Sequence, residues 1–169
     1  WGFAINDERP ESPADLGLWQ PIMQQRYSLI KQYTTKPVMQ VLVGATSPSA
    51  AARAQFLRSL RSSTDTFALD YYPIPYQPTS FISSIGQDLL TAGDSNGWFI
   101  AQAFSWASYP DTASGLGFNL GSARAPSSAE MVGMAALALN SGARNILFYS
   151  YFDIANNPAQ LSALRQAIT

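Results

Sequence analysis

Along its 169 residues the chain repeats one pattern five times: a short apolar segment typical of a β-strand, followed by apolar residues at helical spacing. Pro, Ser or Thr stands near the start of each helical segment, where such residues favour helix initiation. The first segment is expected to be a buried strand that delivers Asp7 and Glu8 to a loop. The expected strands are 1–8, 38–44, 66–73, 98–106 and 145–151, and the expected helices are 13–33, 47–61, 79–90, 126–141 and 158–168.

Repeated strand–helix units predict a single α/β domain with five parallel strands, spanning residues 1–169. Two architectures fit the spacing: the last five units of an eight-unit (βα) barrel, and a five-stranded doubly wound, flavodoxin-like sheet. In both, right-handed crossovers bring the carboxyl ends of the strands to one rim. The side chains that follow each strand are therefore the candidate functional residues.

Carboxylates, an amide and aromatic rings stand at or near the ends of the expected strands. Sugars present hydroxyl groups around apolar ring faces, so a glycan site needs acidic and amide groups for the hydroxyls and flat rings for the C–H faces. This inventory predicts a carbohydrate site. Simpler roles stay open, because acids favour a helix N-terminus and a strand-end Asp often bonds the loop backbone. The candidate site residues are Asp7, Glu8, Asp70, Tyr72, Gln102, Trp106, Arg124 and Tyr149.

Glu8 and Asp70 form the natural pair for hydrolysis of a glycosidic bond. That reaction typically uses one protonated carboxyl group to assist the leaving oxygen and one ionised carboxylate to attack the anomeric carbon or activate water. Glu8 is expected to be the protonated acid and Asp70 the nucleophile or base. We expect the two groups to face each other across a gap of the size of a sugar.

Composition excludes several other classes of function. The chain has no Cys and no His, which removes thiol nucleophiles, Ser-His-Asp triads and Cys or His zinc sites, and we expect no metal or cofactor. Its ten basic residues are scattered and its net charge is −1, so a nucleic-acid partner is not expected. No strand opens into a glycine-rich phosphate loop, and no apolar run is long enough to span a membrane.

The helix expected at 126–141 carries its own start signal. Glu130 follows Ser127 by three residues, the spacing of a capping box, so Glu130 is expected to serve the helix start. Arg124 is expected to bind a substrate carboxylate or to pair with an acid at the rim. The Gly-, Ser- and Pro-rich segment that precedes this helix is longer than most connections, and such loops are usually functional.

Together these pieces resemble the carboxyl-terminal part of the TIM-barrel glycoside hydrolases, especially bacterial barrels with an Asp-Glu-Pro turn. The resemblance implies that the opening strand is the fourth barrel strand, that Glu8 is the acid/base residue, and that the amino-terminal part of the barrel is absent from this chain. A chain that begins with Trp rather than Met is consistent with an excerpt or a processed product. The matching segments are 7–11, 70–74, 102–103, 124–131 and 142–151.

Two departures from the family pattern bear on activity. Arg9 interrupts the Asp-Glu-Pro turn, and Gln102 or a neighbour occupies the place where many such barrels keep a nucleophilic Glu. Three interpretations follow: Asp70 substitutes for the nucleophile, the rest of the barrel supplies it, or the barrel binds glycans without cleaving them. The resemblance implies a glycoside hydrolase of the cell surface or exterior. The alternative is a non-catalytic carbohydrate-binding or structural barrel of a larger extracellular assembly.

Overall fold

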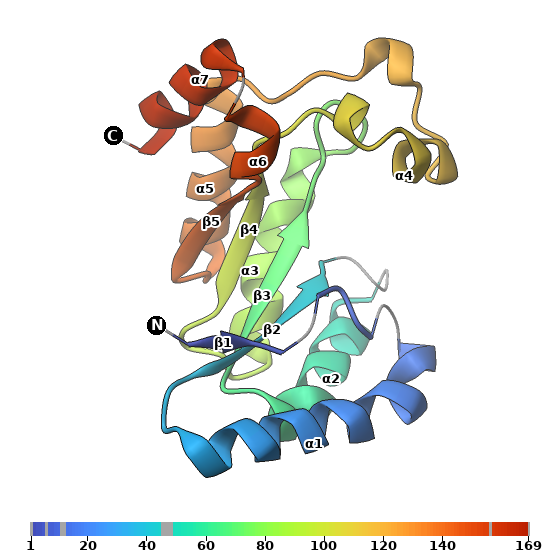
Figure 1. Cartoon of the computed structure of the whole chain (residues 1–169), viewed down its shortest axis with the longest axis vertical. Coiled ribbons are helices and arrows are strands. Elements are labelled where there is room, and N and C mark those ends of the chain that lie inside the picture. Colours follow the sequence, from blue (N-terminus) through green and yellow to red (C-terminus); the bar gives the residue numbers. More distant parts are fainter. Residues whose placement is uncertain (1, 6, 11–12, 45–48, 156, 169) are drawn as a thin grey trace.

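A single parallel sheet organises the structure, a computed structural model that describes residues 2–5, 7–10, 13–44, 49–155 and 157–168. Each strand lies beside the next one in the chain, so the strand order is β1-β2-β3-β4-β5 (Figure 1). A doubly wound sheet reverses its strand order at a switch point, and this sheet does not. The fold is therefore an α/β partial barrel, and the flavodoxin-like alternative is excluded. The strands are β1 (Phe3–Ala4), β2 (Val38–Val43), β3 (Thr66–Tyr71), β4 (Trp98–Gln102) and β5 (Asn145–Tyr149).

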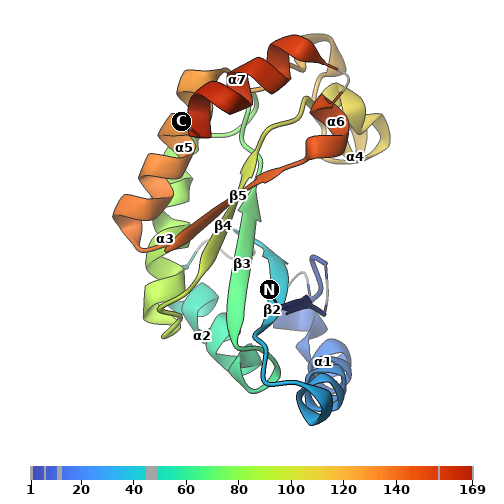
Figure 2. The same cartoon turned by 60° about the vertical axis from the view of Figure 1, so that its left-hand side comes forward.

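Helices follow the strands as the sequence predicts. The long helices are α1 (Leu16–Tyr33), α2 (Ala50–Leu60), α3 (Ile82–Thr91), α5 (Ser128–Ser141) and α7 (Pro158–Ile168). Two short helices, α4 (Pro110–Gly115) and α6 (Tyr151–Ile154), lie beyond the carboxyl ends of β4 and β5 (Figure 2). Within the described ranges, no helix combines the length and the apolar character that crossing a membrane requires.

The two faces of the sheet carry different side chains. Strand residues of one parity, such as Leu42, Phe67 and Phe99, pack with buried residues of the helices in the main core. Residues of the other parity form a smaller cluster made of Val41, Ala68 and Ile100. Because side chains alternate along a strand, this second set marks the inner face of the partial barrel. Asp70 has the parity of Ala68 and therefore belongs to the inner face.

The first strand differs from the expectation. Only Phe3 and Ala4 pair with β2, and the strand is exposed rather than buried, with Phe3 at 43% exposure. The reason is its position at the edge of the sheet, where a strand has a neighbour on one side only. Helix α1 is also less buried than its apolar spacing predicts, because Met23 is its one buried residue among those described.

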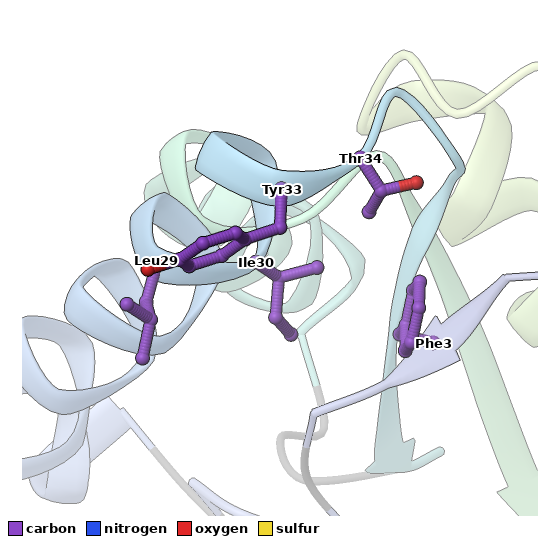
Figure 3. A pocket seen from close by; sticks show the side chains of 5 residues that line it. All are labelled: Phe3, Leu29, Ile30, Tyr33 and Thr34. Atoms are coloured by element: carbon purple, nitrogen blue, oxygen red, sulfur yellow. The ribbon is translucent and has the colours of Figure 1, made fainter.

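An open hollow of about 500 Å³ lies next to this edge, between β1 and the last turns of α1 (Figure 3). Its walls are almost entirely apolar, and two of the wall residues, Leu29 and Tyr33, are well exposed. The hollow lies beside β1, an outermost strand of the sheet within the described ranges. Its lining residues are Phe3, Leu29, Ile30, Tyr33 and Thr34.

The strands predicted at 66–73, 98–106 and 145–151 all end early, and the first of them, β3, stops at Tyr71. β4 stops at Gln102, because Ser105 starts a 3-10 turn at Trp106–Ser108 by accepting a hydrogen bond from the Ala107 amide. β5 stops at Tyr149, and Tyr151 begins α6 instead of continuing the strand. These endings place the residues after β4 and β5 in turns above the rim of the sheet.

Candidate active site

Glu8 lies beyond the end of β1 in an unusual backbone conformation. Among the described residues it is the only non-glycine residue with a positive φ, at 56°. Its amide donates a hydrogen bond to the carbonyl of Val41 at 3.0 Å, which ties the turn to β2. A positive φ is uncommon for residues other than Gly, Asn and Asp, and such conformations cluster at functional sites. The turn leaves the Glu8 side chain exposed.

Asp70 lies near the end of β3, between Val43 of β2 and Ile100 of β4. Asp70 is 2% exposed, so its carboxyl group is buried away from solvent. The side chain of Glu8 makes a hydrogen bond with it, and the Tyr72 hydroxyl donates a second hydrogen bond to Oδ2 at 3.2 Å. The two acids that the strand-end argument selected from the sequence are therefore in contact.

Burial raises the pKa of Asp70 well above its usual range. The hydrogen bond and the negative charge of Glu8 raise it further, and the charge of Asp7 adds to the effect, while the Tyr72 hydroxyl opposes it. The raised pKa widens the pH range over which Asp70 stays protonated. The assignment of Glu8 as the acid and Asp70 as the nucleophile or base stays a prediction.

The spacing of the two acids bears on the reaction class. Carboxyl groups that flank a glycosidic bond are about 5–5.5 Å apart in retaining enzymes and about 6.5–9.5 Å apart in inverting ones. The Glu8 side chain interacts with the buried Asp70 carboxyl group, so the two acids belong to the same part of the mouth. That they face each other across a gap of the size of a sugar stays a prediction.

Aromatic rings form a wall beside the acid pair. Tyr72 and Tyr149 are stacked, with ring centroids 5.8 Å apart and planes at 26°. Behind them Trp106 is 7% exposed, and its indole N–H donates to the Tyr72 carbonyl at 3.2 Å. Tyr149 is 40% exposed, so part of its ring is available to a ligand. Burial, together with the charges of Asp70 and Glu8, raises the pKa of the Tyr72 hydroxyl and keeps it a hydrogen-bond donor.

Gln102 lies below this wall and is fully buried. Its amide oxygen accepts from the Ile74 amide at 2.8 Å, and its amide nitrogen donates to the carbonyls of Ile74 and Phe104 at 2.9 and 3.0 Å. Gln102 therefore holds the loop after β3 against the end of β4. A contact between Gln102 and a ligand would require these backbone hydrogen bonds to open.

Arg124 lies before α5 and binds Glu130 through two hydrogen bonds of 2.7 and 2.6 Å. Glu130 in turn accepts from the Ser127 amide, and the Ser127 hydroxyl caps the Glu130 amide, so the predicted capping box is confirmed. The Arg124 contact is the main reason that the pKa of Glu130 falls to about 2. Arg124 thus pairs with an acid, and that acid is Glu130 in the first turn of α5.

Sequence reasoning missed one cluster at the mouth. The Tyr109 hydroxyl donates to Oδ2 of Asp153 at 2.8 Å, and the Ser150 hydroxyl donates to the same oxygen. Tyr109 belongs to the segment between β4 and α5, whereas Asp153 lies in α6. Asp153 follows a strand and was visible as a strand-end acid, but no spacing in the sequence connects it with Tyr109. Among the described residues, no group of acidic side chains is arranged to hold a metal ion.

The chain was compared with known proteins. No protein-family model and no curated protein matches the sequence. A solved structure, the PgaB (BpsB) glycoside hydrolase domain from Bordetella bronchiseptica, superposes with a TM-score of 0.56 over 93% of this chain at 16% identity. The chain therefore shares its α/β partial-barrel fold with part of that domain. It spans 45% of the length of that structure.

Proposed function

We propose that the chain is part of a glycoside hydrolase-like barrel that hydrolyses a glycosidic bond in an oligosaccharide or polysaccharide. The observation that carries the proposal is the contact between Glu8 and Asp70 at the rim, with Asp70 buried and Glu8 exposed. The fold shared with a glycoside hydrolase domain supports the reaction class. A polysaccharide substrate would place the protein outside the cell or at its surface.

The two acids have different roles in this proposal. Asp70 is too deeply buried to reach a substrate, so it stores the proton at the base of the site. Glu8 reaches the glycosidic oxygen, receives the proton of Asp70 through their hydrogen bond and passes it to the leaving oxygen. The group that meets the anomeric carbon on the other face comes from the substrate or from further βα units before β1, which the edge of the sheet and its apolar hollow would accommodate.

The remaining candidates bind the sugar. Tyr72 and Tyr149 present a stacked aromatic wall to its apolar C–H face. Asp7, which is exposed beside Glu8, accepts hydrogen bonds from the hydroxyl groups of the sugar. Trp106 supports the wall from behind through its bond to the Tyr72 backbone.

A second candidate function is a non-catalytic carbohydrate-binding or structural barrel within a larger extracellular assembly. The closed hydrogen-bond set of Gln102 favours it, because this strand end offers no carboxylate for catalysis. The interaction between Glu8 and Asp70 also favours it, because two acids that interact closely leave less room for a sugar between them. In this alternative the aromatic wall binds a glycan that is not cleaved.

Replacement of Glu8 by Gln tests the proposal in the natural polypeptide. The release of reducing ends from a panel of polysaccharides is expected to fall by about 10²–10⁴-fold, the usual effect of removing a general acid or base. Glycan affinity is expected to persist, because Gln keeps the size and polarity of the side chain. Asp111→Asn, which neutralises an exposed acid in α4, is the matched control and keeps full activity.

The outcomes separate the two functions. If Glu8→Gln released reducing ends as fast as the wild type, Glu8 would have no catalytic role. A wild-type protein that retains glycans but releases no sugar from any of them would replace the hydrolase by the binding module.

A further inference from the structure

The segment between β4 and α5, residues 103–127, is held over the mouth by aromatic rings. Phe104 and Trp106 are buried in a cluster that also includes Tyr72, Tyr109 and Phe118. The ring of Phe104 meets Tyr109 edge-on at 5.0 Å and Tyr149 edge-on at 5.9 Å. One buried ring thus touches both the segment and the wall of the candidate site.

A carboxylate of α6 fastens this segment to the strand that carries the wall. Asp153 accepts the Tyr109 hydroxyl at 2.8 Å and also accepts the hydroxyl of Ser150, the residue that follows β5. Hydrogen bonds to an ionised acceptor are stronger than bonds between neutral groups. Asp153 therefore bridges the 103–127 segment and the end of β5 with a single oxygen.

The contact continues to the wall and to the acid pair. The Tyr109 hydroxyl lies 3.5 Å from the Tyr149 hydroxyl, and the Tyr149 ring stacks on Tyr72, whose own hydroxyl donates to Asp70. A shift of Tyr109 would free the polar end of Tyr149 and leave its ring held by its contacts with Tyr72 and Phe104. The acid pair itself is held by Tyr72 and by its own hydrogen bond, so it does not depend on Tyr109.

We propose that Asp153 is a positioning residue: it holds Tyr109, and through Tyr109 the Tyr149 ring, so that Tyr149 and Tyr72 form one rigid wall for the sugar. The inference rests on the proposed carbohydrate site and applies whether the glycan is cleaved or only bound. A ring that is already held in place binds the sugar more tightly, because it loses little conformational entropy when the sugar binds.

Two variants and their combination test the inference in the natural polypeptide. Tyr109→Phe keeps the ring and removes its hydroxyl, and Asp153→Asn keeps the shape and removes the charge. Each is expected to raise KM for the glycan, or its Kd where no cleavage occurs, by about tenfold, while kcat stays within about twofold and the pH profile of kcat is unchanged. The double variant is expected to bind the glycan no more weakly than the more weakly binding of the two single variants, because both changes act on the same hydrogen bond: Tyr109→Phe removes its donor and Asp153→Asn leaves it only a neutral acceptor. The controls are Tyr33→Phe, an exposed Tyr, and Asp111→Asn.

Amide hydrogen exchange provides a second measurement that does not depend on activity. Residues 105–123 are expected to exchange about tenfold faster in Asp153→Asn and Tyr109→Phe than in the controls, while β3 keeps its protection. Unchanged exchange or unchanged glycan affinity would overturn the inference. A fall in kcat with a shifted pH profile and unchanged KM would also overturn it, because Asp153 would then take part in proton transfer. If the wild type cleaves no glycan, the hydrolase proposal fails, and affinity and exchange still decide the role of Asp153.

Discussion

Asp70 shows how the position of one residue decides its chemistry. Its parity on β3 directs it to the inner face, where neighbours on both sides keep it from water. An ionised carboxylate there would lie beside the carboxyl group of Glu8, and the single hydroxyl of Tyr72 does not offset that repulsion. Burial and this repulsion therefore raise the pKa of Asp70, so the neutral form persists to a higher pH in the folded protein than in the unfolded chain.

This burial predicts how stability depends on pH. The folded-state pKa of Asp70 is raised above its unfolded value of 3.8, so between these two values the folded chain binds more protons than the unfolded chain. The contribution of Asp70 to the free energy of unfolding therefore becomes less favourable as pH rises through this window. Asp70→Asn, which stays neutral, should lose that downward slope. Urea unfolding of both proteins from pH 4 upward measures it, and parallel pH curves would contradict the prediction.

At the scale of elements, close contact between α3 and α5 fixes how two strand–helix units pack. A Cβ added at Gly86 of α3 would lie 2.8 Å from the backbone carbon and from the Cβ of Ser141, and 2.9 Å from the Ala138 carbonyl oxygen. These atoms belong to the last turn of α5, which cannot withdraw without disturbing its packing. Gly133, in the middle of α5, has free space at the same position.

The two glycines predict opposite effects of the same substitution. Gly86→Ala should lower the free energy of unfolding by about 2 kcal/mol, because overpacking outweighs the better helix propensity of Ala. Gly133→Ala should raise it by about 0.5–1 kcal/mol, since only the helix propensity changes. Chemical denaturation of both variants measures the difference. Equal effects would show that the α3–α5 contact is not as close as described.

The start of α5 allows a prediction about a helix cap. The Ser127 hydroxyl accepts the Glu130 amide, and Glu130 is also held by Arg124. Ser127→Ala should lower the free energy of unfolding by about 1 kcal/mol, the usual effect of losing an N-cap. Ser162→Ala, an exposed position inside α7, serves as the control in the same denaturation series. A loss no larger than that of the control would contradict the role of the cap.

Local signals explain which elements the sequence predicts well. The start of α2 follows from the Ser49 cap and the start of α7 from Pro158, because caps and breakers act within a few residues. The early end of β4 depends on the turn that begins at Ser105. The sequence does not indicate this turn, because the apolar residues of the strand continue past its actual end. The rule that functional groups lie at strand ends selected Glu8 and Asp70, but their contact depends on the pairing of three strands and on the positive φ of Glu8. The bond from Tyr109 to Asp153 joins distant segments and has no local signal.

For the whole molecule, the important feature is a parallel sheet whose outer strands, β1 and β5, each have a neighbour on one side only within the described part of the chain. At the β1 edge the apolar hollow adds exposed side chains, with Leu29 at 55% and Tyr33 at 82% exposure. Apolar surface beside unpaired backbone groups favours association with another chain or segment. The edge is thus a surface suited to association with another chain or segment.

This surface predicts the behaviour of the 169-residue chain in isolation. Sedimentation velocity should show association that increases with concentration, and the double variant Leu29→Glu with Tyr33→Glu should weaken it, because charges at the hollow oppose apolar contact. Leu116→Glu is the control, since Leu116 is 54% exposed in the segment between β4 and α5, away from the hollow. Equal weakening by the control would show that the hollow has no special role.

The sequential strand order has a consequence for synthesis in the cell. Each strand pairs with the strand made just before it, so no strand must wait for a distant part of the polypeptide to appear. The growing chain can add one unit at a time to an existing template as it leaves the ribosome. Stalling translation after each unit should therefore yield nascent chains whose protease resistance grows stepwise, from the amino-terminal units onward.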